Sequence, residues 1–214
     1  MRLLGLAICA ALAVATAFEG PAGAATHTVR VVIRPVTSTG HVRAGFAVMD
    51  EPTGSVDCSF AEASPGAVNR NIDVCSPSAE YPIACWNAAL VHHVLCMRDP
   101  RIARVVRIPR LGPFAATAVA PVAERAPLMI RLADGDICSI RDGGTSAVLR
   151  SHPAWIARYY CVLGGAVWAP AAAAHNGVNE SNPIWTVRTA SAAGTGRIVV
   201  RAVVRAWFVG TFNG

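Results

Sequence analysis

Five arginines recur at every third position in the stretch RDPRIARVVRIPR, between residues 98 and 110. They are Arg98, Arg101, Arg104, Arg107 and Arg110. On one surface these five positive charges would be possible contacts for an anionic ligand. A polyproline-II backbone, with three residues per turn, would align every third side chain on one edge.

The residues between these arginines favour a strand instead. Val105, Val106 and Ile108 are β-branched and suit a pleated sheet. In a strand, side chains three apart lie on opposite faces, and in a helix they spread around the axis. The preferred interpretation is therefore a solvated strand in a basic chain of net charge +6, which carries arginine and no lysine. Attraction of anionic polymers or surfaces is the alternative.

Other reactive residue types occur without a recognised catalytic or metal-binding spacing. The adjacent His92 and His93 would point to opposite faces of a strand and could not easily share one ion. Asp134, Asp136 and Asp142 lie in DGDICSIRDGG, which lacks the spacing and the later glutamate of a calcium loop and suits turns better. We predict no catalytic residue, no metal site, no cofactor and no nucleic-acid partner.

The first 24 residues are typical of a secretory signal peptide. Met1 and Arg2 precede an apolar run and then small residues, so we expect cleavage after Ala24, with cleavage after Ala17 as the alternative. The run of about 15 apolar residues is shorter than the ~20 that a membrane-spanning helix needs. We therefore predict a secreted or cell-envelope protein with no transmembrane segment in its mature chain.

Cleavage would remove Cys9 and leave six of the seven cysteines. These are Cys58, Cys75, Cys85, Cys96, Cys138 and Cys161. An even number of cysteines in an exported chain indicates disulfides. Spacing alone does not determine the pairing, but sequential pairs would each close a short loop between neighbouring strands. We therefore expect Cys58–Cys75, Cys85–Cys96 and Cys138–Cys161.

Aromatic residues gather beside these cysteines. Trp86 follows Cys85, and Trp155, Tyr159 and Tyr160 precede Cys161. Aromatic side chains next to disulfides are more often core than exposed binding platform. We expect them to cover the disulfides.

Alternating apolar residues predict the strands that must position all these groups. Residues 26–50 read as a hairpin with a turn at 37–40, and residues 85–96 as a hairpin or a short helix. Residues 76–82 suit one helical turn, and the proline- and alanine-rich residues 112–127 suit a connector. Further strands are predicted in the second half.

The last strand is the longest of those predicted. It covers residues 197–209, with an apolar face formed by Ile198, Val200, Ala202, Val204, Ala206 and Phe208. Six of its residues are Val or Ile, which favours strand over helix. A strand of this length would extend over about 43 Å at ~3.3 Å per residue, so we expect a bend or a bulge.

Five stretches carry a resemblance to a known group of proteins. They are CSPSAEYPIACW, LCMRDPRIARVVRIP, DGDICSIRDGG, SNPIWTV and AWFVGT. Together they resemble an uncharacterised family of exported proteins, with a signal peptide and six cysteines, from mycobacteria and related actinobacteria. The resemblance implies export and disulfides, and it implies no catalytic residue.

The sequence therefore predicts a mostly β protein, a disulfide-bonded β-sandwich or barrel with short helical turns. Residues 25–214 would form a single β-rich domain. We expect a binding or interaction protein of the cell envelope or extracellular space, whose partner is a cell-envelope polymer or protein. The alternative is a secreted hydrolase with an unrecognised active site.

Overall fold

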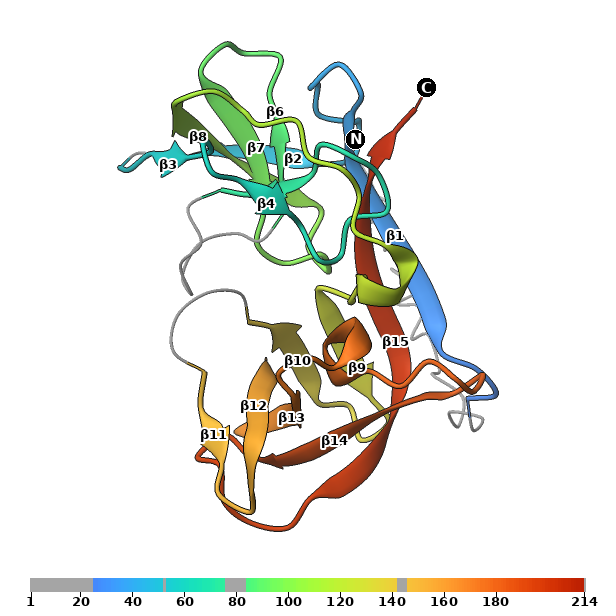
Figure 1. The fold of residues 1–214 in the computed structure, drawn as a ribbon. Helices are drawn as coiled ribbons and strands as arrows, with labels where there is room; N and C mark the ends of the chain where they lie inside the picture. The colour runs from blue at the N-terminus through green and yellow to red at the C-terminus, as the bar shows by residue number, and fades with distance from the viewer. Residues whose placement is uncertain (1–24, 52, 76–83, 142–145, 214) are drawn as a thin grey trace, which may run out of the picture.

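The computed structural model describes residues 25–51, 53–75, 84–141 and 146–213 (Figure 1). Its strands form two sheets. We call the sheet that is built only from strands of the N-terminal half the upper sheet. The strands of this half are β1 (Val29–Thr37), β2 (Ala47–Asp50), β3 (Val56–Asp57), β4 (Glu62–Ala63), β5 (Asp73–Val74), β6 (Ala84–Asn87), β7 (His93–Met97) and β8 (Arg104–Leu111). The strands of the second half are β9 (Met129–Leu132), β10 (Ile137–Ile140), β11 (Val148–Leu149), β12 (His152–Cys161), β13 (Gly165–Pro170), β14 (Trp185–Ser191) and β15 (Val199–Phe212).

Six of the second-half strands close into a barrel, and β11 pairs with β12 outside this ring. Their order is β15-β14-β13-β12-β10-β9, and β9 pairs back onto β15. Closure leaves no free edge in this ring of strands. The prediction of a mostly β, disulfide-bonded barrel or sandwich is confirmed.

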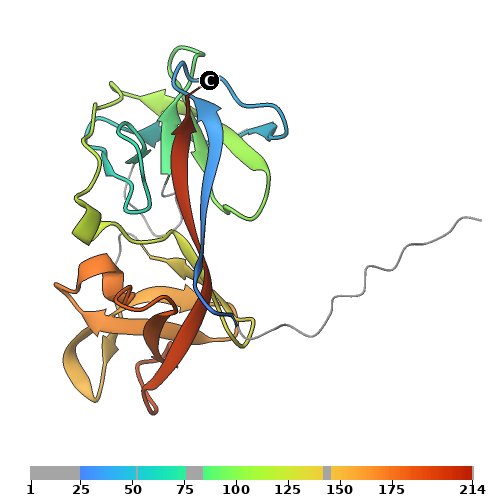
Figure 2. The same ribbon diagram turned by 90° about the vertical axis from the view of Figure 1, so that its right-hand side faces the viewer.

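Strand β15 joins the barrel to the rest of the molecule (Figure 2). Its first half pairs with β14 and its second half pairs in parallel with β1. A register shift between Val203 and Arg205 confirms the expected bulge. Before this bulge, the predicted inward face of β15 is wrong. Val200, which was predicted to face inward, is 63% exposed, whereas Val203 on the opposite face is buried. The extra residue reverses which side chains face inward, so Ala206 and Phe208 are buried after it as predicted.

The upper sheet has the order β2-β8-β7-β6-β5-β4, with β3 paired to β8. Strands β6 and β7 form the hairpin that was one of the two alternatives for residues 85–96. The hairpin predicted for residues 26–50 is wrong. Strand β1 pairs with β15 and β2 with β8, both in parallel, and only the bridge between Val36 and Val42 joins the two segments.

The three disulfides have the expected sequential pairing. Cys58 bonds to Cys75, Cys85 to Cys96, and Cys138 to Cys161. The last two pairs join residues that lie directly opposite on neighbouring antiparallel strands. Such bonds indicate an oxidising environment outside the cytosol. The predicted signal peptide lies outside the described residues.

One hydrophobic core runs through both sheets. It includes Trp86 and Val105 of the upper sheet and Ile130, Tyr159 and Phe208 of the barrel. The expected core position of the aromatic residues is thus correct for Trp86 and Tyr159, while Trp155 and Tyr160 are half-buried. A smaller core cluster in the upper sheet contains Val56, Cys58, Cys75, Cys85, Val94, Cys96 and Ile108.

The segment between β8 and β9 links the two sheets, as the composition of residues 112–127 suggests. Its one helical element is the 3-10 turn η1 (Val122–Glu124), and a second such turn, η2 (Ala174–Gly177), follows β13. The helical turn predicted at residues 76–82 lies outside the described residues. Within the described ranges, neither of these short turns nor any other helix has the length and apolarity to cross a bilayer.

The turn after β1 depends on a glycine. Gly40 has φ +79°, and its carbonyl accepts the Ala89 N–H at 2.9 Å, which docks this turn on the upper sheet. A Cβ at Gly40 would lie 2.5 Å from the Ala89 nitrogen. We expect Gly40→Ala to lower the free energy of unfolding by about 2 kcal/mol, measured by urea denaturation.

A matched control for this substitution is Gly45→Ala. Gly45 also has a positive φ, of +92°, but a Cβ there would meet nothing within 4 Å. Gly45→Ala should therefore be destabilised only by the unfavourable positive φ. Its free energy of unfolding should fall by less than that of Gly40→Ala. Equal losses in the two variants would contradict the proposed docking role of Gly40.

Candidate functional site

The structure separates the five arginines between residues 98 and 110. Arg104, Arg107 and Arg110 lie on β8, which confirms the favoured strand for that part. Three of the five guanidinium groups are paired with carboxylates: Arg98 with Glu51 at 3.1 Å, Arg101 with Asp99 at 2.6 Å, and Arg107 with Asp50 at 2.6 Å. Arg110 donates instead to the Gly112 carbonyl. Contact of these arginines with an anionic ligand stays a prediction.

The Asp50–Arg107 pair shows how these charges are balanced. Arg107 donates from Nε and from a terminal nitrogen to the two carboxylate oxygens of Asp50. This hydrogen bonding lowers the pKa of Asp50 and raises the pKa of Arg107. An incoming anion would have to compete with a carboxylate that is already bound in the bidentate geometry.

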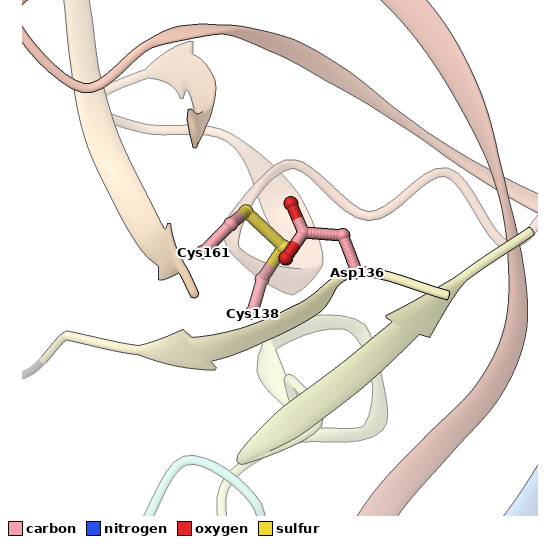
Figure 3. A group of neighbouring side chains, drawn as sticks. All are labelled: Asp136, Cys138 and Cys161. Atoms are coloured by element: carbon pink, nitrogen blue, oxygen red, sulfur yellow. A yellow bond between two sulfur atoms is a disulfide. The ribbon is translucent and has the colours of Figure 1, made fainter. Parts of the chain in front are cut away.

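A second cluster joins Asp136 to a disulfide (Figure 3). The carboxylate of Asp136 and the sulfurs of Cys138 and Cys161 lie within 4.8 Å of one another. Both sulfurs are consumed in an S–S bond of 2.05 Å and provide no thiolate for a metal. Asp136 accepts the N–H groups of Ile137 and Leu163, at 2.9 and 3.2 Å, and so holds the turn after β12.

The remaining acidic and histidine residues singled out in the sequence also have local partners. Asp134 accepts the Asp136 N–H at 3.2 Å and pairs with Arg201, as turn chemistry suggests, and Asp142 lies outside the described residues. His93 Nδ1 is 2.9 Å from the Val91 carbonyl oxygen, and His92 has a positive φ of 59° in the turn before β7. The described members of this set thus form local hydrogen bonds and an ion pair, and His93 lies close enough to Asp50 to help lower the pKa of that carboxyl.

A groove with a volume of about 1090 Å³ lies at the end of β1 and β15, beside the upper sheet. We refer to it as the groove. Its amide side chains are Asn69, Asn71, Asn87 and Asn213. Its hydroxyl groups belong to Thr37, Ser38, Thr117 and Thr211. Trp86, Phe114 and Arg70 also contribute to its walls.

Five separate segments line this groove, and hydrogen bonds connect the loop at residues 68–71 to two of the others. Val68 donates its N–H to the Val209 carbonyl at 2.9 Å, and the Asn69 side chain accepts the Thr211 N–H at 2.9 Å. Asn71 has a left-handed backbone, with φ 60°, and donates its N–H to the Thr117 carbonyl at 3.3 Å. The amide-bearing loop 68–71 is thus held between β15 and the connector.

Two buried side-chain atoms near the groove, the indole nitrogen of Trp86 and one carboxylate oxygen of Asp73, have no hydrogen-bond partner among the described residues. Trp86 is 2% exposed and its indole N–H donates to none of them. Asp73 is fully buried; one of its oxygens accepts the Thr117 hydroxyl and the other accepts nothing within that part of the chain. Burial raises the pKa of Asp73 to about 6. Unpartnered buried polar groups are uncommon and often mark functional positions.

None of the groove residues was predicted as a site from the sequence. The one local signal is the stretch NRN at residues 69–71, which places two amides and a guanidinium group in three positions. The other amides come from remote segments and carry no common spacing. Comparison of the chain with protein-family models, with curated proteins and with solved structures found no match in any of the three.

Proposed function

We propose that this chain is an exported, disulfide-stabilised binding protein of the cell envelope or extracellular space, and that the groove is its ligand-binding surface. The three disulfides support the compartment, because they persist in oxidising surroundings. The volume of the groove, about 1090 Å³, is that of a site for a sizeable ligand.

The chemistry of the groove lining carries this proposal. Among the described lining residues, the polar side chains are amides and hydroxyls, and Arg70 is the one ionisable group. Amides and hydroxyls donate and accept hydrogen bonds near neutral pH without changing charge. Hydrolysis requires a nucleophile together with a general base. The lining therefore favours binding over bond cleavage.

The alternative, a secreted hydrolase, rests on one contact near the groove. Thr39 Oγ1 lies 3.1 Å from His41 Nδ1 in the turn after β1. Both residues are exposed, and no carboxylate of the described chain forms an ion pair with His41. A triad-like site would need a third group to orient the imidazole. If the chain is a hydrolase through this pair, His41→Ala should abolish hydrolysis without changing ligand binding.

The test is to fill the groove and measure binding. Ala116 is an exposed residue of the groove wall, so Ala116→Trp should obstruct the groove without disturbing the core. The oxidised, processed protein should bind saturably to a sedimented mycobacterial cell-envelope fraction, the source that the sequence resemblance suggests. We expect Ala116→Trp to reduce binding at least about tenfold, which corresponds to ~1.4 kcal/mol.

The matched control is Ala123→Trp. Ala123 is exposed in η1, on the same connector but outside the groove lining, so the variant should bind like the wild type. Binding should also persist in about 1 M salt, which screens attraction between exposed charges. Equal binding by both variants, or loss of binding on adding salt, would contradict the proposed function.

A further inference from the structure

One wall of the groove is formed by the connector around residues 113–120, and many of its main-chain groups form no hydrogen bond within the described chain. Residues 113–120 contain no helix, strand or turn. None of the N–H groups from Phe114 to Ala120 donates to another residue of the described chain. Their carbonyls accept there only at Thr117, from Asn71, and at Ala120, from Arg125. Main-chain groups that the protein leaves unpaired must bond to water or to a ligand.

Within this wall, the exposure of residues 116–119 alternates as it does in an extended chain. Ala116 and Ala118 are exposed whereas Thr117 and Val119 are half-buried, which is the alternation of extended chain. Thr117 anchors the wall through its hydroxyl, which donates to Asp73, and through its carbonyl. Successive residues of an extended chain direct their main-chain groups to opposite edges. The edge of Ala116 and Ala118 is therefore the open one.

The rest of the groove suits a peptide backbone. A carboxamide side chain carries one acceptor and two donors, so it can pair with both the C=O and the N–H of a peptide unit. A carbohydrate would instead stack a sugar ring on an exposed aromatic face, but of the two aromatic residues in the described lining, Trp86 is only 2% exposed and Phe114 is half-buried. The small side chains of Ala116 and Ala118 allow another backbone to approach closely.

We infer that the groove binds an extended peptide segment of a protein partner, which adds as a strand along Ala116 and Ala118. This inference rests on the proposed function and specifies its ligand class. Strand addition to an open edge is a general mode of peptide recognition, in which main-chain hydrogen bonds supply affinity. Arg70 is the charged residue of the described lining, and the whole chain has a net charge of +6, so the segment carries an acidic side chain or a terminal carboxylate near Arg70.

The test uses a phage-displayed library of random dodecapeptides, selected on the oxidised protein. We expect enrichment of peptides with at least one acidic residue. A selected peptide is then synthesised with single N-methyl groups along its backbone. Because alternate N–H groups of a strand face its neighbour, N-methylation should weaken binding about tenfold at every second position and little between. Arg70→Gln should weaken binding of the parent peptide about fivefold.

Controls separate this inference from the proposed function. Ala116→Trp should abolish peptide binding, and Ala123→Trp should not. Chitotetraose and mannan serve as carbohydrate probes. If these bind and Ala116→Trp blocks them while no peptide is selected, the groove is a binding site but the peptide inference is wrong. A selected peptide without the two-residue N-methyl pattern also overturns strand addition. If envelope binding is insensitive to Ala116→Trp, the proposed function itself fails.

Discussion

Replacing both Cys85 and Cys96 with alanine is expected to lower the free energy of unfolding by about 3 kcal/mol. The Cys85–Cys96 disulfide connects β6 to β7, the centre of the upper sheet. Part of the loss comes from the unfolded chain, which gains freedom once the loop is open. The remainder comes from packing, because both sulfurs are buried.

The composition of the small upper-sheet core explains why this loss should be large. Four of its seven buried residues are the cysteines of two disulfides. The neighbouring strands β3, β4 and β5 have only two residues each. Small cores of this kind rely on covalent links, because they bury too little apolar surface to be stable alone.

Urea denaturation measures this loss, and hydrogen exchange locates it. We expect amides of β6 and β7 to lose protection in the double variant, while β12 to β14 of the barrel keep theirs. The matched control is the pair Cys138→Ala and Cys161→Ala, which should weaken the barrel and leave β6 and β7 protected. A loss below about 1 kcal/mol, or equal exchange throughout both sheets, would contradict the local stabilisation of the upper sheet by the Cys85–Cys96 disulfide.

Asp73→Asn is expected to stabilise the protein by about 3 kcal/mol at a pH of about 8 and to have little effect at a pH of about 3.5. Burial raises the pKa of Asp73 from 3.8 to about 6 in the folded chain. A difference of about two pKa units corresponds to ~3 kcal/mol at ~1.4 kcal/mol per unit. Asparagine has the same shape, stays neutral, and can still accept the Thr117 hydroxyl.

The sign follows from proton linkage. Between the unfolded and folded pKa values, the folded state binds more protons than the unfolded state, so wild-type stability falls as the pH rises from about 4 to about 6. Above that range, Asp73 is charged in both states, and the free energy of unfolding is lowered by the full cost of burying that charge. Below it both states are protonated and the cost disappears, which is why the substitution gains nothing there.

Urea denaturation at a series of pH values measures this dependence, and Asp57→Asn is its control. Asp57 accepts the Ser59 N–H at 2.8 Å, and this hydrogen bond lowers its pKa. Removing its charge should therefore destabilise the protein at neutral pH, the opposite direction. Destabilisation by Asp73→Asn at a pH of about 8, or a gain that does not vary with pH, would contradict the assignment of the charge cost to Asp73.

Local patterns in the sequence determined the strand content, gave the 85–96 hairpin as one of two alternatives, and led to the expected bend or bulge in the last strand and the expected sequential pairing of the cysteines. Each of these depends on residues close together in the chain. Cys85 and Cys96 face each other because a short hairpin puts them there, and the long run of Val and Ile in β15 forces a bulge for reasons of length alone.

Tertiary structure alone decided the partners of β1 and β2, the inward face of β15 before its bulge, and the groove. Alternation shows that one face of a strand is apolar, but not which remote strand it will pair with. The parallel pairing of β1 with β15 joins the two ends of the described chain. The groove amides Asn69, Asn87 and Asn213 meet only because this pairing brings β15 beside the upper sheet. Contacts between such distant segments leave no spacing in the sequence, since they depend on how the whole core packs.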